Sequence, residues 1–334
     1  MAHTFWKGIA GLVLAGLLAA PAWGDNRSSS TAVPGTVNYV EGAVTLDGNS
    51  LNSKSVGSAN LETGQSISTQ TGKTEFLLTP GVYVRLADNS KATLVSPSLT
   101  NTQVSVDQGE AMVEVDELHK QNDIQVVENG ISTQLAKTGL YDFNSANNTV
   151  RVFSGEADVL ENDHRVKVKG GHELNLQSAQ LKTAKFDKGP AEASDLYRWS
   201  SLRSDYLAEA NIDAAGVYYA NGWYGPGWIG TGWYWDPWLA GYTFLPGEGM
   251  FYNPFGWGFY SPRFVYYSPL WYRGYYGRAL AGTHPPIRNG VGPVGHPATA
   301  HSGFRGGEGG FHGGSSFHSG GGFSSGTMGF GGHR

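Results

Sequence analysis

A short phrase of strand, glycine and strand occurs twice in the 334-residue chain, and it constrains the fold more than any other feature. Residues 106–113 read VDQGEAMV, residues 152–159 read VFSGEADV, and residues 40–44 read VEGAV as a looser copy. Such repetition indicates one supersecondary unit that is used several times. A companion phrase, Gly-x-Tyr within an apolar run, begins at residue 81 and again at residue 139. We expect structural turns at Gly42, Gly81, Gly109, Gly139 and Gly155.

Residues 36–185 alternate apolar and polar side chains in short runs, as β-strands do. Val82, Val84 and Leu86 are one such set, and turn dipeptides such as Asp47-Gly48 and Asn129-Gly130 separate the runs. Short strands at this spacing predict a sandwich, a barrel or a β-solenoid. The neighbouring carboxylates of one run are most simply a solvated strand face; they are Glu110, Glu114, Asp116 and Glu117.

The first 24 residues have the pattern of a cleaved export signal. Lys7 precedes an apolar run from Ile9 to Ala20, and small residues follow before Asp25. The run is too short to span a bilayer, and no later segment is long and apolar enough, so no transmembrane segment is expected in the mature chain. We therefore expect a protein of the periplasm or the cell surface.

Several classes of site are excluded or absent from the sequence. The chain has no cysteine, which excludes disulfides and thiolate sites. Its 23 Lys+Arg against 28 Asp+Glu do not suggest the clustered basic face that nucleic-acid binding needs. Neither a Gly-x-Ser-x-Gly elbow nor a His-Glu-x-x-His motif occurs. We expect no enzyme activity and no cofactor.

Three segments resemble the FecR-domain family. Residues 42–46 read GAVTL, residues 61–69 read LETGQSIST with Gly72 as the next turn, and residues 76–86 read FLLTPGVYVRL. The order of these motifs is similar to the opening of FecR-type domains over residues 36–130, and more loosely to residue 212.

The resemblance implies a periplasmic β-solenoid-like or sandwich-like domain at residues 36–185. In the founding members this domain lies between a cytoplasmic sigma-factor regulator and an outer-membrane receptor. This chain has an export signal where those proteins have a cytoplasmic domain and a membrane span. It looks more like exported FecR-domain proteins with an aromatic, glycine-rich C-terminus.

A single helix is predicted over residues 190–212. Pro190 suits a first turn, Ser194 suits an N-terminus, and apolar side chains recur at helical spacing from Leu196. The stripe indicates a helix that packs on the end of the β zone; a partner-binding helix is the alternative.

Residues 217–276 form an aromatic segment rich in Gly and Pro, with 24 aromatic residues among 60. Stacked rings could form a platform for a ligand such as a sugar, or they could pack into a small core. The candidate platform residues are Trp223, Trp228, Trp233, Trp235 and Trp238.

Residues 281–334 are rich in Gly and His, and a disordered tail is predicted because so little apolar area cannot offset the entropy of ordering. We expect no defined metal site; three histidines are weak candidates only, namely His312, His318 and His333.

Together these features predict a non-enzymatic, exported FecR-like protein that acts by binding in the cell envelope. The partner would be an envelope protein or wall polysaccharide. One alternative is a structural surface or matrix protein with a cohesive Gly/Phe/His-rich tail. Another is the periplasmic part of an iron-type sigma-factor signalling pathway.

Export makes a direct prediction. The intact mass of the secreted product should correspond to a start near Trp23 or Asp25. A membrane-bound product that retains Met1 would contradict it.

Overall fold

A large β-sheet accounts for most of the residues that the structure describes. The computed structural model describes residues 32–161, 164–178, 180–222 and 230–268, so the predicted export signal and tail lie outside them. The sheet has 15 strands. Their bounds are β1 Val37–Leu46, β2 Asn49–Leu51, β3 Ser66–Leu77, β4 Val82–Leu86, β5 Lys91–Ser98, β6 Asn101–Gln108, β7 Glu110–Val115, β8 Ile124–Glu128, β9 Ile131–Leu135, β10 Gly139–Asn144, β11 Thr149–Ser154, β12 Glu156–Glu161, β13 His164–Lys169, β14 His172–Asn175 and β15 Ala184–Lys185.

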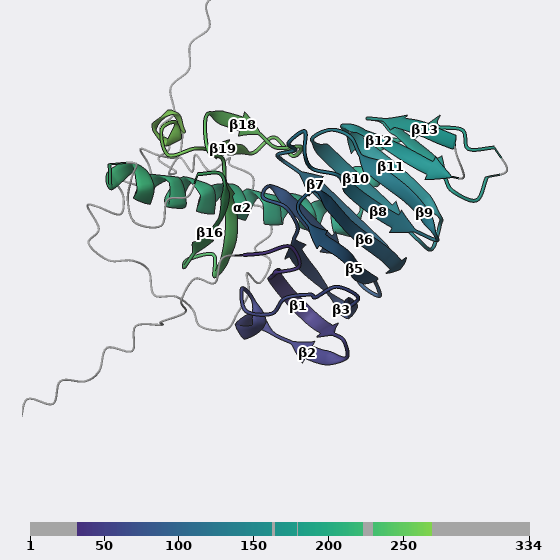
Figure 1. Ribbon diagram of the computed structural model, residues 1–334, viewed down its shortest axis with the longest axis horizontal. Coiled ribbons are helices and arrows are strands. Elements are labelled where there is room, and N and C mark those ends of the chain that lie inside the picture. Colours follow the sequence, from purple (N-terminus) through teal and green to yellow (C-terminus); the bar gives the residue numbers. More distant parts are fainter. Residues whose placement is uncertain (1–31, 162–163, 179, 223–229, 269–334) are drawn as a thin grey trace, which may run out of the picture. The chain divides into compact units, whose positions relative to one another are not determined.

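Strand β3 belongs to both halves of this sheet. Its residues 66–68 pair with β5 and its residues 74–77 pair with β4. One half continues through β5, β6, β8, β9, β12 and β13, of which β5, β6, β8 and β9 lie side by side in Figure 1. The other half continues through β4, β7, β10, β11, β14 and β15.

The two halves share one buried core. Val104 and Val126 from the first half lie in the same apolar cluster as Val113 and Phe143 from the second. The halves therefore pack face to face, as in a β-sandwich. Among the described strands only β6 and β8 pair in parallel, whereas a parallel β-helix would stack all of its strands in that way. The mainly β fold is confirmed, in a sandwich-like form.

The two copies of the strand–glycine–strand phrase, at residues 106–113 and 152–159, form corners between the halves. The chain leaves β6 in one half and enters β7 in the other at Gly109, and it crosses back from β11 to β12 at Gly155. Both glycines have positive φ, 76° and 92°. At both corners a hydroxyl meets the next backbone N–H, because Glu110 N donates to Ser90 Oγ (2.9 Å) and Glu156 N donates to Tyr141 Oη (3.2 Å).

Two of the five expected glycine turns are not turns. Gly42 lies inside β1, at an irregularity of its pairing with β3. Gly139 is the first residue of β10, and it must be glycine because a Cβ there would lie 2.2 Å from Ser154 O. Close approach of two backbones, rather than chain reversal, explains Gly139. Gly81 does lie in the turn between β3 and β4, with φ 79°.

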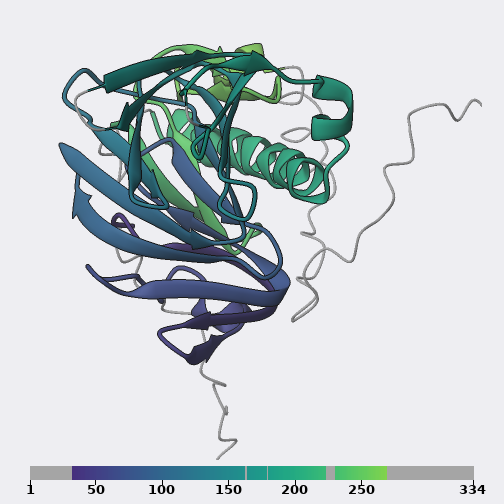
Figure 2. The same ribbon diagram turned by 90° about the vertical axis from the view of Figure 1, so that its right-hand side faces the viewer.

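Two helices and two hairpins follow the sheet. Their bounds are α1 Lys188–Glu192, α2 Asp195–Ala220, β16 Gly232–Asp236, β17 Gly241–Leu245, β18 Met250–Tyr252 and β19 Gly258–Tyr260, with short 3-10 turns η1 at Ser53–Ser55 and η2 at Val265–Tyr267. The long helix α2 runs alongside β16 and β19 in Figure 1 and is also prominent in Figure 2. No helix in the described ranges has the length and apolar character needed to cross a bilayer.

These elements cover the outer face of the half-sheet that contains β4 and β7. Leu77 and Tyr83 of the sheet share a second apolar core with Leu207 of α2 and with Trp233 and Phe244 of the first hairpin. Strand β4 is consequently buried on both faces: Val82, Val84 and Leu86 face the sandwich core, and Tyr83 and Arg85 face α2 and the hairpins.

The corner at Gly155 gives a testable prediction about stability. A Cβ on Gly155 would meet Tyr141 Oη at 2.4 Å, whereas a Cβ on Gly48 would meet nothing within 4 Å, although both residues have positive φ. Gly48→Ala should destabilise the protein by about 1–2 kcal/mol through the left-handed backbone alone. Gly155→Ala should be worse by a further ~1–3 kcal/mol from overpacking. Urea denaturation of both variants measures the difference, and equal losses would contradict the close approach.

Candidate functional site

A row of directly paired residues, five of them charged, crosses the outer face of the sheet under α2 and its neighbouring loops. Across six strands the directly paired residues are Glu75, Arg85, Met112, Asp142, Arg151 and Glu173. Opposite charges that face each other across strands stabilise a sheet. The predicted solvated strand face is wrong for Glu114, which is fully buried, and for Asp116, which is nearly so, whereas Glu110 and Glu117 are half-buried. The alternation of apolar and polar side chains predicted that only the apolar face of these strands is buried, but the polar face is buried as well.

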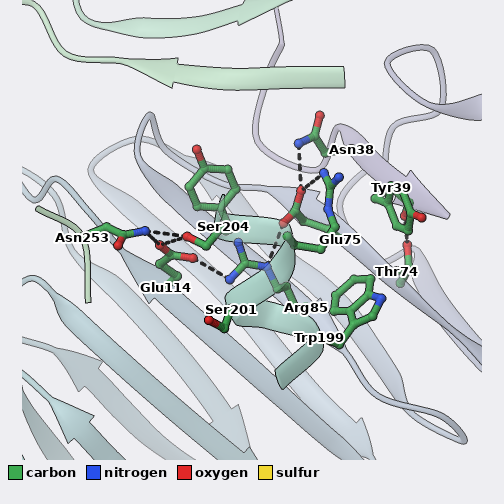
Figure 3. A network of polar contacts seen from close by, with 12 residues as sticks. Asn38, Tyr39, Thr74, Glu75, Arg85, Glu114, Trp199, Ser201, Ser204 and Asn253 are labelled. Atoms are coloured by element: carbon green, nitrogen blue, oxygen red, sulfur yellow. Dashed lines mark hydrogen bonds and ion pairs between the residues drawn. The ribbon is translucent and has the colours of Figure 1, made fainter. Parts of the chain in front are cut away.

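Three charged residues form the centre of a buried polar network (Figure 3). Arg85 donates from Nε to Glu75 (2.7 Å) and from Nη1 to Glu114 (2.5 Å), and all three side chains are fully buried. Burying charges is strongly unfavourable unless they are paired and hydrogen-bonded. Both carboxylates meet this requirement by binding polar groups from other parts of the chain.

Each carboxylate of the network binds a different part of the covering layer. Glu75 accepts from Arg203 of α2 (2.9 Å) and from the Asn38 amide (2.9 Å), which also donates to Tyr242 O of β17. Glu114 accepts from Ser204 of α2 (2.7 Å) and from the Asn253 amide (2.6 Å). The network thus ties α2 and both hairpins to the sheet.

The electrostatics follow from burial and pairing. Burial alone would raise the pKa of Glu75, but the charges of Arg203 and Arg85 lower it to about 2. Burial raises the pKa of Asp116 well above its ordinary value, and the adjacent Glu114 carboxylate raises it further. The pKa of Tyr83 also rises, through burial and then through Asp116 and Glu114. The role of Glu75 and Glu114 is structural, because both carboxylates accept their hydrogen bonds from donors of the same chain.

Helix α2 is placed by polar contacts at its start. Ser194 caps it by accepting from Tyr197 N (3.2 Å), as the sequence predicted, and Lys73 of β3 forms an ion pair with Asp195 (2.7 Å). The helix then runs to Ala220, beyond the predicted end at residue 212. Arg203 is buried because it binds Glu75 of the network, and the neighbouring Leu202 is exposed.

The three candidate platform tryptophans that the structure describes do not form one exposed surface. Trp233 is only 7% exposed and packs edge-on against Tyr83 and Phe244, so it belongs to the second core. Trp235 is half-buried against Tyr242. Trp238 is 38% exposed, and Trp223 and Trp228 lie outside the described residues. Trp233 as a ligand-stacking residue is therefore incorrect, because its ring fills the gap between β4 and the hairpin.

A different set of apolar side chains is exposed along α2 and the second hairpin. We call it the aromatic strip; it consists of Leu202, Tyr219, Met250, Tyr252, Trp257, Tyr266 and Tyr267. Tyr266 lies 6.2 Å from Tyr219 and 4.1 Å from Tyr267 between ring centroids. At the other end Trp257 donates from Nε1 to Ser201 O of α2 (3.3 Å).

Strand β18 shows why the strip was not evident from the sequence. Phe251 points inward and stacks on Phe259 at 5.5 Å, while Met250 and Tyr252 on either side of it point outward. Tyr252 is 67% exposed. In a segment where nearly every second residue is aromatic, composition does not reveal which rings are buried; only the packing of the hairpin on α2 separates them.

Among the described residues no group of three or more histidine or acidic side chains is arranged to hold a metal ion. The three candidate histidines, His312, His318 and His333, lie outside the described ranges.

No family model matches the sequence, and no curated protein matches it. Among solved structures the chain is similar to two crystal structures of a putative anti-sigma factor from Parabacteroides distasonis ATCC 8503, at 1.65 Å and 2.50 Å resolution. Both are 14% identical to it, with TM-scores of 0.32 and 0.34. The alignment covers 36% of this chain and 60% of the first, and 55% of this chain and 99% of the second. Membership of the FecR family stays a prediction.

The network predicts how the free energy of unfolding depends on pH in the acid range. Because the pKa of Glu75 is lowered to about 2 in the folded protein, its contribution is complete above the ordinary value near 4.5 and is lost as pH falls towards 2. That contribution is on the order of 3 kcal/mol. Glu75→Gln should cost about 3–5 kcal/mol at pH 7, because it leaves two buried arginines undercompensated.

The same variant should flatten the loss of stability between pH 4.5 and 2 in urea denaturation. Glu62→Gln, at an exposed carboxylate on the sandwich, is the matched control and should change neither quantity. A Glu75→Gln protein with wild-type stability at pH 7 would show that the network is dispensable.

Proposed function

We propose that this chain is a non-enzymatic, exported binding protein whose contact surface for a protein partner is the aromatic strip. The observation that carries the proposal is the concentration of exposed apolar side chains on α2, β18, η2 and the β18–β19 turn, on a layer that the buried network fixes to the sheet. Surfaces that bind proteins are enriched in Tyr, Trp and Met, and a few such residues supply most of the affinity.

A protein partner fits the strip better than a polysaccharide does. Sugar sites combine stacking rings with polar groups that converge on the ligand, and the strip consists of apolar and aromatic side chains. Wall polysaccharide is therefore an outcome of the test rather than the proposal. Export, location in the envelope and the absence of enzyme activity are part of the same proposal and are supported by the signal-like N-terminus and by the sequence motifs that are missing.

Photo-crosslinking from the strip tests the proposal. A photoreactive phenylalanine analogue at Tyr252, expressed in the producing cells, should give a discrete protein adduct, whereas the same analogue at Leu99 should give none. Leu99 is 53% exposed in the β5–β6 turn of the sandwich, remote in sequence from the strip, and serves as the matched control.

The contribution of the strip to binding is measured by the affinity for the crosslinked partner. The double substitution Tyr252→Ser and Tyr267→Ser should weaken binding at least ~10-fold, as expected for two ring contacts of hot-spot type, and Leu99→Ser should leave it unchanged. If the double substitution instead abolishes co-sedimentation with purified peptidoglycan and no protein adduct forms, the ligand is polysaccharide. If neither assay responds, the strip is not the binding surface.

A further inference from the structure

Glu114 is the point where the aromatic strip is held to the sheet. Its Oε2 accepts from Arg85 of β4 (2.5 Å), and its Oε1 accepts from Ser204 of α2 (2.7 Å) and from Asn253 (2.6 Å). Asn253 follows β18 directly, and its amide also donates to Ser204. Three elements that are distant in sequence therefore meet at one buried carboxylate.

Asn253 both shapes the second hairpin and attaches it. Its Oδ1 accepts from Phe255 N (3.1 Å) and from Trp257 N (2.9 Å), which forms the turn between β18 and β19, while its amide binds Glu114. Met250, Tyr252 and Trp257 of the strip lie on this hairpin and its turn. The bond between Asn253 and Glu114 thus helps to fix these three side chains, together with Asn211 of α2, which binds the backbone of Tyr260 in β19.

A second carboxyl group lies beside this attachment point. Asp116 is two residues beyond Glu114 and therefore on the same side of the strand, and it is only 7% exposed. Neither of its oxygens has a hydrogen-bond partner among the described residues. The charged and titratable groups around it are Glu114 of β7, Tyr83 and Arg85 of β4, and Glu75 of β3. Helix α2 contributes the charged Arg203, which binds Glu75, and the neutral Ser204, and the hairpin contributes the neutral Asn253.

We propose that Glu114 and Asp116 form a proton-controlled latch that holds the β18–β19 hairpin, and with it part of the aromatic strip, against the sheet. With a proton on Asp116 the buried pair carries one negative charge, which Arg85, Ser204 and Asn253 satisfy. Loss of that proton places a second negative charge beside Glu114 in a buried site where neither Asp116 oxygen accepts a hydrogen bond. Like charges at this distance in a poorly solvated site repel strongly, and release of the hairpin admits water to them.

The direction of the pH dependence follows from the packing. Burial and then Glu114 raise the pKa of Asp116 in the closed latch above the value near 4 that an exposed aspartate has. The equilibrium constant for closure is therefore highest below pH ~4, where Asp116 is protonated in both states. It falls by up to about tenfold for each pH unit above that, until the pH passes the raised pKa of Asp116 in the closed state. A rise in pH opens the latch, and a fall in pH closes it.

Hydrogen–deuterium exchange of the full exported chain tests the latch without any binding partner, so its result is independent of the proposed function. The quantity is the protection factor of residues 250–260, corrected for the intrinsic pH dependence of exchange and divided by that of β5 and β6 in the sandwich. In the wild type this ratio should fall between pH 5 and pH 9. In Asp116→Asn, which cannot ionise at this position, the fall of the ratio should be absent.

Two further variants complete the experiment. Asn253→Ala removes the amide that binds Glu114 and should lower the ratio at every pH, with the protection of β5 and β6 retained. Glu62→Gln replaces an exposed carboxylate and should keep the wild-type slope. Glu128 also titrates in this range, since burial raises its pKa to about 8, but it pairs with the reference strand β6, so its ionisation would lower the protection of β6 and raise the ratio, opposite to the expected fall. A ratio that is constant with pH in the wild type, or that still falls in Asp116→Asn, would overturn the proposal.

Discussion

The ion network of Glu75, Arg85 and Glu114 is the interaction on which the rest of the structure depends. Three fully buried charges on the outer face of a sheet could not persist under apolar cover alone, because each would lose its hydration without compensation. The covering layer therefore has to bring its own polar groups. Arg203 and Ser204 of α2, and Asn253 of the second hairpin, supply them.

This requirement explains why the helix lies where it does. Its apolar side chains alone would allow many positions on a face that also offers Leu77 and Tyr83, because apolar packing is not directional. Two hydrogen-bonded contacts one residue apart, from Arg203 to Glu75 and from Ser204 to Glu114, fix both the rotation and the register of α2. The buried polar groups contribute specificity, which is the role for which such groups are best attested.

The aromatic segment divides its rings between the inside and the outside of this layer. Trp233 and Phe244 fill the space over β4, while Tyr252 and Tyr267 stay exposed. The same buried carboxylate that orders α2 also holds the turn beside Tyr252, so an exposed surface is coupled to a buried charge. That coupling is the physical basis for both proposals.

The sequence by itself determined the local structure. The Asp47-Gly48 and Asn129-Gly130 turns, with positive φ at all four residues, and the cap at Ser194 follow from local chemistry and were predicted. Tertiary structure alone decided which strand faces are buried, that Gly139 allows two backbones to approach, and that Trp233 is core whereas Tyr252 is surface. The reason is that a strand presents the same alternation whether its polar side chains meet water or meet an arginine on another strand. Only the pairing of β3, β4 and β7 beneath α2 turns Glu114 from an apparently solvent-facing residue into part of a fully buried network with Glu75 and Arg85.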